Sequence, residues 1–263
     1  RHGEQAAPWL LHGAAARTQL AAADSVVLLG QAEGTLYFAL GLDDGFTPPP
    51  DTMLSNLRAQ FGQMPAASLA LLGYARAMLH WRRHNRFCGH CGTATESRCA
   101  GHELHCPRCG NILYPRINPA IIVLVSDGER CLLGHQSPTA PPRYSTLAGF
   151  VEPGEDLESA VRREVFEETN IRVGALHYRH SQPWPYPASL MLGFRAEALN
   201  TDIRCNDGEL RDARWFTREQ LRADYAAGNL ELPTRLSISW RLLRDWFDAD
   251  GGSLAAVQAE RAA

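Results

Sequence analysis

The stretch GFVEPGEDLESAVRREVFEETNI, residues 149–171, gathers six glutamates around an apolar stripe. A helix over 156–169, at about 100° per residue, would turn that stripe toward a sheet. The side chains of the stripe are Leu157, Ala160, Val161 and Val165. Glu167 and Glu168 follow Glu164 by three and four residues, so the three carboxylates can converge on one patch. Because like charges repel, the spacing predicts either a solvated acidic face or a site for divalent cations with oxygen ligands.

The composition is that of an ordinary globular protein. The chain has 263 residues, 45% of them hydrophobic, and a formal net charge of −3, so charge gives no general attraction to nucleic acid or membranes. We find no apolar run near the roughly 20 residues that a membrane span needs, and no basic-then-apolar leader. Seven cysteines are an odd count that favours reduced thiols and a metal over disulfides. We therefore predict a cytoplasmic protein.

The order of sequence patterns predicts four parts. We expect an α+β N-terminal domain over 1–83, a cysteine module over 84–115, an α/β domain over 116–248 and a flexible tail over 249–263. Ser68 is expected to cap a helix that runs to about residue 84. Thr217 and Gln220 predict a capping box. The other expected elements are strands within 25–42, 117–136 and 189–199, a helix over 218–226 and a helix over 235–248.

The cysteine module contains two C-x-x-C pairs, Cys88/Cys91 and Cys106/Cys109. Two thiolates three residues apart can hold one metal ion from a tight turn, and two such turns complete a tetrahedral site. The spacing predicts one structural Zn²⁺ per chain. Two redox-active C-x-x-C motifs are a weaker alternative because the βαβ context is missing. Cys99, His102 and His105 lie in the intervening loop and could compete as ligands, although the two pairs leave no vacancy.

The stretch 149–171 resembles the signature of the Nudix hydrolases. That signature is Gly, five residues, Glu, seven residues, then Arg-Glu-aliphatic-x-Glu-Glu-x-Gly-aliphatic. The positions that fit are Gly149, Glu155, Arg163, Glu164, Val165, Glu167, Glu168 and Ile171. Asn170 stands where the family has glycine, and asparagine is the next-best residue for the left-handed conformation of a helix C-cap. The resemblance implies an α/β/α sandwich with a mixed sheet.

The resemblance also implies hydrolysis of a nucleoside diphosphate linked to another group, assisted by Mg²⁺ or Mn²⁺. Glu164 and Glu168 would be metal ligands, and Glu167 would be a further ligand or the base that deprotonates water. Arg163 would pair with Glu155 and orient the helix. By the same resemblance, the backbone of Ala148 and the carboxylate of Glu209 would assist metal binding.

A second segment, SQPWPYPAS at 181–189, bears on the substrate. Three prolines alternate with Trp184 and Tyr186, so the segment is stiff and can present aromatic faces to a base or a nicotinamide ring. A loop that merely plugs a hydrophobic core would have the same composition. The segment resembles the array of the NADH pyrophosphatase branch of the Nudix family, with Tyr186 where phenylalanine is usual and Ala188 where glutamine is frequent. That branch also carries a four-cysteine zinc ribbon before the Nudix domain and a poorly defined N-terminal domain.

The resemblance to this branch implies cleavage of NAD(H) to nicotinamide mononucleotide and AMP, and removal of an NAD cap from RNA. It also implies a homodimer. The residues that would contact substrate are Tyr114, Gln182, Pro183, Trp184, Pro185, Tyr186, Pro187, Ala188, Ser189 and, on a looser correspondence, Ser239. Two alternatives stay open: a Nudix hydrolase of ADP-ribose or another dinucleotide, and a nucleotide sensor or RNA-binding protein without catalysis.

Overall fold

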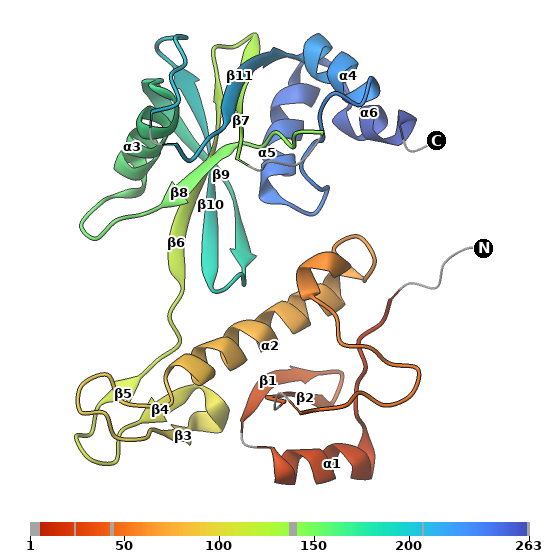
Figure 1. The fold of residues 1–263 in the computed structure, drawn as a ribbon, viewed down its shortest axis with the longest axis vertical. Coiled ribbons are helices and arrows are strands. Elements are labelled where there is room, and N and C mark those ends of the chain that lie inside the picture. The colour runs from red at the N-terminus through yellow and green to blue at the C-terminus, as the bar shows by residue number, and fades with distance from the viewer. Residues whose placement is uncertain (1–5, 24, 43–44, 137–140, 207, 262–263) are drawn as a thin grey trace. The chain divides into compact units, whose positions relative to one another are not determined.

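The computed structural model describes residues 6–23, 25–42, 45–136, 141–206 and 208–261 (Figure 1). The chain divides into two compact units. The N-terminal unit contains Arg1–Ile117 together with Trp184–Ala188, and the C-terminal unit contains Asn118–Pro183 and Ser189–Ala263. Five residues from the middle of the C-terminal half therefore fold with the N-terminal unit. None of the helices in the described ranges is long and apolar enough to cross a membrane.

The C-terminal unit is built on a six-stranded sheet. Five strands follow the order β11-β7-β6-β10-β9, and β8 pairs with β6. Their bounds are β6 Asn118–Ser126, β7 Arg130–His135, β8 Leu147–Phe150, β9 Val173–Trp184, β10 Ser189–Ala198 and β11 Asp212–Thr217. β6 runs parallel to β10 but antiparallel to β7 and β8, so the sheet is mixed, as predicted.

Helices cover both faces of this sheet. α3 (Leu157–Thr169) lies on one side and α5 (Ile238–Phe247) on the other, as Figure 1 shows. The alternation of side chains along β6 explains this arrangement, because Ile121 and Val123 belong to the cluster under α3 while Ile122 and Leu124 belong to the cluster under α5. A nearly continuous apolar strand is what a sheet buried on both faces requires. The predicted α/β/α sandwich is confirmed.

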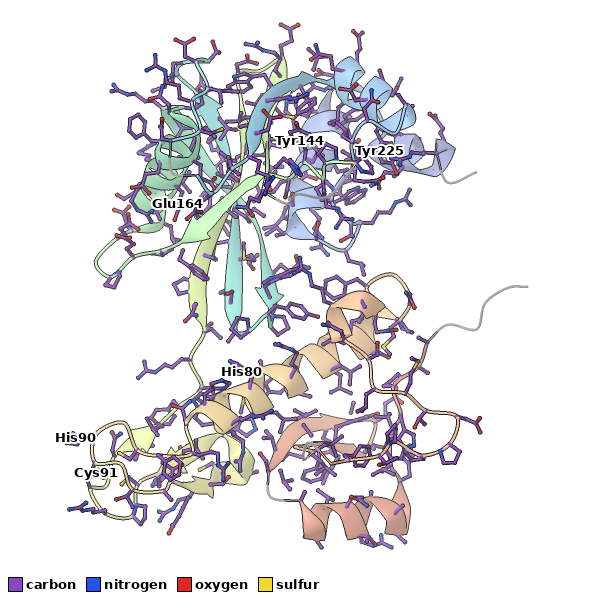
Figure 2. The ribbon with its side chains drawn as sticks, in the orientation of Figure 1. His80, His90, Cys91, Tyr144, Glu164 and Tyr225 are labelled. Carbon is purple, nitrogen blue, oxygen red and sulfur yellow. The ribbon has the colours of Figure 1, made fainter. Side chains whose placement is uncertain are left out.

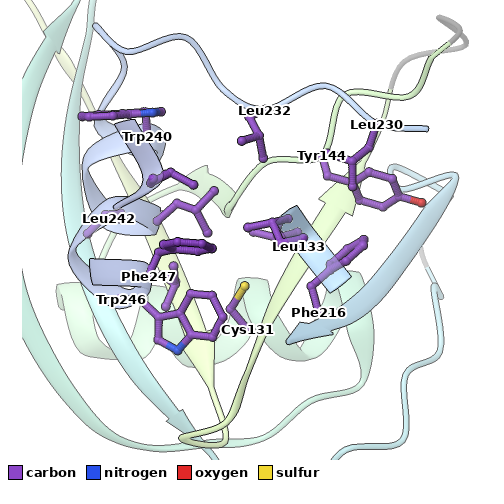
Figure 3. Close-up of a cluster of buried hydrophobic side chains, with 14 of the residues drawn as sticks. Cys131, Leu133, Tyr144, Phe216, Leu230, Leu232, Trp240, Leu242, Trp246 and Phe247 are labelled. Atoms are coloured by element: carbon purple, nitrogen blue, oxygen red, sulfur yellow. The ribbon is translucent and has the colours of Figure 1, made fainter. Parts of the chain in front are cut away.

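The cluster under α5 is rich in aromatic rings (Figure 3). Trp246 and Phe247 are almost fully buried and lie next to strands β6 and β7. The cluster also receives α4 (Arg218–Ala226) and α6 (Leu254–Glu260), whose Leu254 and Val257 are buried. This differs from the flexible tail that we expected over 249–263, since apolar residues three apart on a short helix fix the chain end to the core.

The N-terminal unit has a much smaller core. It contains α1 (Gly13–Ala22), the hairpin of β1 (Val26–Ala32) and β2 (Thr35–Leu40), the 3₁₀ turn η1 (Leu57–Gln60), α2 (Ala66–His84) and a three-stranded ribbon. The ribbon strands are β3 (Glu96–Arg98), β4 (Glu103–His105) and β5 (Ile112–Leu113), with the turn η2 (Cys99–Gly101) between β3 and β4. The core cluster of the N-terminal unit joins the hairpin, α2 and the ribbon, and its buried members are Val27, Ala39, Met78, Trp81 and Leu104.

Several helix boundaries test the predictions directly. The capping box of Thr217 and Gln220 is present, and Asn170 takes the left-handed conformation with φ 63°. Ser68 does not cap α2, which begins at Ala66 after Pro65, because the Pro65 carbonyl already accepts from the Leu69 amide. α5 begins at Ile238 rather than near 235, since Ser237 provides its side-chain cap.

Candidate active site and zinc centre

The four cysteines of the ribbon come together. Their sulfurs all lie within 4.8 Å of one another, with 3.7 Å between Cys88 and Cys109 and 3.4 Å between Cys91 and Cys106. A tetrahedral site with Zn–S bonds of about 2.3 Å needs sulfurs about 3.8 Å apart, so the four residues fit a zinc ion.

The two turns that carry these sulfurs share one geometry. Gly92 and Gly110 follow the pairs with φ 73° each, and their amides donate to the carbonyls of Cys88 and Cys106. A left-handed residue at that point favours glycine because it has no Cβ. The His90 amide, followed by other hydrogen bonds, lowers the pKa of Cys88 to about 6, which favours the thiolate form that binds metal. Cys99, the possible competitor, is exposed and outside the cluster.

The predicted catalytic glutamates lie on α3 but differ in exposure. The Glu168 side chain is buried, Glu164 is mostly buried with 13% of its side chain exposed, and Glu167 is half exposed at 51%. Figure 2 shows Glu164 on the part of α3 that lies near β8. Asp156 starts the helix by accepting from the Ser159 amide. Residues 157–169 thus form the predicted helix, with its N-cap at the expected first residue.

Arg163 connects the carboxylates of this region. Its guanidinium donates to both oxygens of Glu155 at 2.7 and 2.9 Å, and to Glu167 at 3.0 Å. The same nitrogen that reaches Glu167 lies 3.0 Å from Glu164, and another donates to the Phe150 carbonyl. The pair with Glu155 was predicted. The further contacts with Glu164, Glu167 and Phe150 were not, because the signature gives spacing without side-chain direction.

The carboxylates of Glu164 and Glu167 both lie 3.0 Å from Arg163. In the described ranges, the four cysteines are the only group of three or more possible ligands whose atoms all lie within 4.8 Å. Burial raises the pKa of Glu164, Arg163 opposes the rise, and the charges of Glu167 and Glu209 add to it. Glu209, which was predicted from the resemblance alone, is therefore close enough to act on Glu164 electrostatically.

Gly149 on β8 makes room for Glu164. A Cβ at this position would lie 1.8 Å from the Glu164 carboxyl carbon, so no other residue fits there without moving the carboxylate. Gly149 pairs with Ile121 in the sheet, and its neighbour Ala148 pairs with Ile122. The strand backbone and the carboxylate thus form one compact wall. A wall of hard oxygen donors with this charge fits a divalent cation.

The predicted substrate residues fall into both units. Gln182 and Ser239 belong to the C-terminal unit and use their polar atoms internally. The Gln182 side chain donates to the Leu236 carbonyl and accepts from the Ile238 amide, both at 2.7 Å. The Ser239 hydroxyl is buried and accepts from the amide and the hydroxyl of Thr146. In this structure both side chains fix the start of α5.

The remaining predicted substrate residues also lie in both units. Pro183 ends the C-terminal unit's part of β9, and Ser189, which is buried, begins β10 opposite Asn118. Tyr114 follows β5 in the N-terminal unit and is 51% exposed. The segment Trp184–Ala188 packs within the N-terminal unit, where Phe61 contacts the rings of Trp184 and Tyr186.

The comparisons with known proteins agree along the chain. Residues 116–236 match the NUDIX domain, 83–114 match the NADH pyrophosphatase zinc ribbon domain, and 3–81 match the NADH pyrophosphatase-like rudimentary NUDIX domain.

Several curated proteins are similar over most of the chain. The NAD-capped RNA hydrolase NudC of Deinococcus radiodurans is 41% identical over 85% of this chain and 78% of its own length. The enzyme of the same name from Chromobacterium violaceum is 40% identical over 78% of each chain. The human NAD-capped RNA hydrolase NUDT12 is 36% identical over 80% of this chain and 50% of its own length. The chain belongs to the Nudix family, in the group that carries the NADH pyrophosphatase zinc ribbon.

Proposed function

We propose that this protein hydrolyses the pyrophosphate bond of NAD(H) to nicotinamide mononucleotide and AMP, and removes the NAD cap from RNA 5′ ends. The main observation behind the proposal is that Arg163 contacts the carboxylates of Glu155 and Glu164, and that Glu164 fills the space beside Gly149. The chain is also about 40% identical to proteins named NAD-capped RNA hydrolase. A sensor without catalysis would have no need for this complete set of carboxylates.

The residues that would hold Mg²⁺ or Mn²⁺ are Glu164, Glu167, Glu168, Glu209 and the backbone of Ala148. Their oxygen atoms are the hard donors that these cations prefer. A bound divalent cation would offset the charge of the pyrophosphate and lower the pKa of a coordinated water.

The chain's own residues prepare the site for this chemistry. Arg163 fixes the direction of Glu164 and Glu167 and ties α3 to the loop that carries Glu155. Glu167 is the most exposed of the three glutamates, so water on the substrate side reaches it first, and we assign it the acceptance of the proton from the attacking water. Glu155 and Arg163 support the site without contacting substrate.

The segment Trp184–Ala188 supports a dinucleotide with a flat ring as the substrate. Its two aromatic rings lie 5.1 Å apart and are held by prolines on either side. A stiff aromatic pair can stack on nicotinamide with little loss of conformational entropy. Tyr114, Pro183 and Ser189 complete the proposed substrate contacts. Gln182 and Ser239 remain in the proposal as residues that fix the start of α5.

The setting that we propose is a cytoplasmic homodimer with one Zn²⁺ per chain. None of the seven cysteines is in a disulfide, which suits a reducing compartment. The N-terminal unit exposes large apolar side chains, among them Met53 at 81% and Leu54 at 64%, which supports a partner surface. Light scattering of the purified protein at several concentrations tests the dimer.

The test of the function is product analysis after incubation with Mg²⁺ or Mn²⁺ and NADH, NAD⁺, ADP-ribose or NAD-capped RNA, each alone. Glu168→Gln removes a buried carboxylate of the site, and Glu158→Gln is the matched control because Glu158 lies exposed in the first turn of the same helix. We expect AMP and the mononucleotide from NADH, a loss of at least about 10³-fold in Glu168→Gln, and no change in Glu158→Gln.

Two results would contradict the proposal. Faster turnover of ADP-ribose than of NADH would keep the chemistry and overturn the dinucleotide assignment of Trp184 and Tyr186. No turnover of any substrate by a protein that still binds NADH would favour the sensor. Circular dichroism of each variant confirms that an inactive protein is still folded.

A further inference from the structure

Helix α2 contacts residues 184–188, called here the aromatic segment, through the side chain of Arg76. Arg76, on α2, donates from one guanidinium nitrogen to the Pro185 carbonyl and, at 3.4 Å, to the Pro187 carbonyl. Its guanidinium carbon also lies 5.0 Å from the centre of the Tyr186 ring. All of these residues belong to the N-terminal unit. One side chain therefore contacts three consecutive residues of the segment.

The backbone carbonyls of Pro185 and Pro187 need a hydrogen-bond donor such as Arg76. Pro185 and Pro187 have no amide hydrogen, and the Tyr186 amide turns back to the Trp184 carbonyl at 2.8 Å. The carbonyls of the two prolines would otherwise rely on water, because the segment lies beyond the end of β9. An arginine suits this position because its planar fork can reach both carbonyls while its face lies on an aromatic ring. A lysine could keep the charge but not the fork.

Gly73 shows that the fit between α2 and the segment is close. It is a buried glycine in the interior of α2, where glycine costs about 1 kcal/mol relative to alanine. A Cβ at this position would lie 3.1 Å from the Pro185 ring, which is tighter than ordinary contact. Gly73 and Arg76 are three residues apart and so lie on one face of the helix. The helix is thus shaped on that face to receive the segment.

The aromatic rings add a third contact. Phe61, directly after η1, lies edge-on to Trp184 at 5.8 Å and to Tyr186 at 5.9 Å between ring centres. Burial raises the pKa of Tyr186, and the positive charge of Arg76 opposes that rise. Phe61 fixes the planes of the rings, whereas Arg76 fixes the backbone between them.

We propose that Arg76 is a positioning residue for the substrate: through the carbonyls of Pro185 and Pro187 it sets the orientation in which Trp184 and Tyr186 receive the nicotinamide ring. The N-terminal unit thereby contributes to substrate affinity through residues 184–188. The kinetic part of this inference rests on the proposed function. Its structural part, the ordering of residues 184–188 by Arg76, does not.

The test compares Arg76→Ala, Arg76→Lys and the matched control Arg82→Ala. Arg82 lies on the same helix and donates to Ser25 and Ser97, so its removal takes the same charge from α2 without touching the segment. Hydrogen exchange of a peptide that covers Tyr186 to Leu190 reports the order of the segment, and steady-state kinetics with NADH report its use.

We expect Arg76→Ala to speed exchange in this peptide and to raise KM about tenfold while kcat changes by less than about twofold, the pattern of lost binding that is equal in ground and transition states. Arg76→Lys is expected to recover part of the affinity. Arg82→Ala is expected to leave both the exchange of the peptide and KM unchanged, even where it lowers the melting temperature. A second variant, Gly73→Val, pushes on Pro185 and is expected to raise KM in the same way.

Unchanged exchange in Arg76→Ala would overturn the proposal whatever the kinetics. Faster exchange with an unchanged KM would overturn the link to substrate. An equal rise of KM in Arg82→Ala would show that loss of the N-terminal core, and not the segment, is responsible. If the unsubstituted protein does not hydrolyse NADH, the proposed function fails, and the exchange data alone then decide whether Arg76 orders the segment.

Discussion

The two candidate metal centres differ in how they gather like groups. In the ribbon, four sulfurs lie within 4.8 Å of one another. On α3, the carboxylates of Glu164 and Glu167 instead share contacts with Arg163 at 3.0 Å. Thiols can lie close while they keep their protons, whereas carboxylates that are charged at neutral pH need a cation between them. A closed site of soft thiolate ligands can therefore be recognised from the distances between its ligand atoms. An open site of hard carboxylate ligands is recognised instead from the residues that support those ligands.

The roles of the two centres follow from the same difference. Four protein ligands leave no open position on zinc, so the ribbon centre can stabilise the fold but cannot activate water. Carboxylates on one helix leave room for water and substrate around a cation. Substitutions in the ribbon centre should therefore change stability, and substitutions around the carboxylates should change activity.

Removal of one zinc ligand should unfold the ribbon. We expect Cys106→Ala to abolish zinc binding, because structural zinc supplies about 10 kcal/mol or more of folding free energy in small modules. Metal analysis should fall from one zinc per chain to almost none, and hydrogen exchange over 88–110 should become fast. Cys99→Ala is the control, since Cys99 is exposed in the same ribbon but outside the cluster. Retention of stoichiometric zinc in Cys106→Ala would break the comparison.

A methyl group on β8 should damage the carboxylate site without unfolding the unit. In Gly149→Ala the new Cβ would meet the Glu164 carboxyl, which must rotate away. We expect kcat/KM for NADH to fall about 100-fold, the size of effect that a displacement of about 1 Å can have on a catalytic group. The zinc content should stay at one per chain. A variant with full activity would mean that the position of Glu164 does not limit catalysis.

The ion pair of Glu155 and Arg163 should appear in the pH dependence of stability. Hydrogen bonds from Arg163, then from the Glu152 amide, lower the pKa of Glu155 from 4.5 to about 2. A lowered pKa in the folded state stabilises the protein above the unfolded value, and this contribution is lost as the pH falls from 4.5 toward 2. Urea unfolding should show a lower free energy of unfolding for Glu155→Gln than for the parent at pH 6. The difference between the two free energies should become smaller as the pH falls from 4.5 toward 2. Glu158→Gln should show no such narrowing.

The smallest effect is expected at the end of α3, where the chain departs from the family signature. Asn170 has φ 63°, so Asn170→Ala should cost about 1–2 kcal/mol of unfolding free energy. Asn170→Gly restores the family residue and should change stability by less than about 0.5 kcal/mol, since glycine adopts this conformation readily but loses the contact to the Asp202 carbonyl. Thermal melts of both variants measure the difference. Equal losses in the two would show that the side-chain contact, and not the backbone conformation, matters.

Local signals predicted much of the fold. The helix α3, the turn at Asn170 and the capping box at Thr217 all depend on residues within a few positions of one another. The strand β9 was missed because it lies at the edge of the sheet and exposes a run that includes Tyr178 and Arg179, so it lacks the alternation that marks a strand. α1 was missed because GAAARTQLAA has no apolar stripe.

The candidate site was predictable in a different way. The signature predicted the three glutamates of α3 as site residues, but it could not show that Arg163 also contacts Glu164 and Glu167, because those contacts depend on the packing of α3 against β8. The signature also could not show that the side-chain amide of Gln182 hydrogen-bonds to the backbone of Leu236 and Ile238, more than fifty residues away. Gly73 was the signal in the sequence that could have predicted the contact of α2 with the aromatic segment. A glycine inside a helix indicates that another part of the chain packs closely against the helix at that point.

The split composition of the N-terminal unit has a consequence for synthesis on the ribosome. Its residues up to Ile117 emerge first, but Trp184–Ala188 follow only after most of the sheet of the other unit has been made. At about 5–20 residues per second the ribosome takes roughly 4–14 s to pass from residue 117 to residue 188. Over that interval Phe61 lacks both of the rings that later cover it. The nascent chain therefore carries an incomplete apolar surface, and the N-terminal unit closes only after residues 118–183 of its neighbour have been translated.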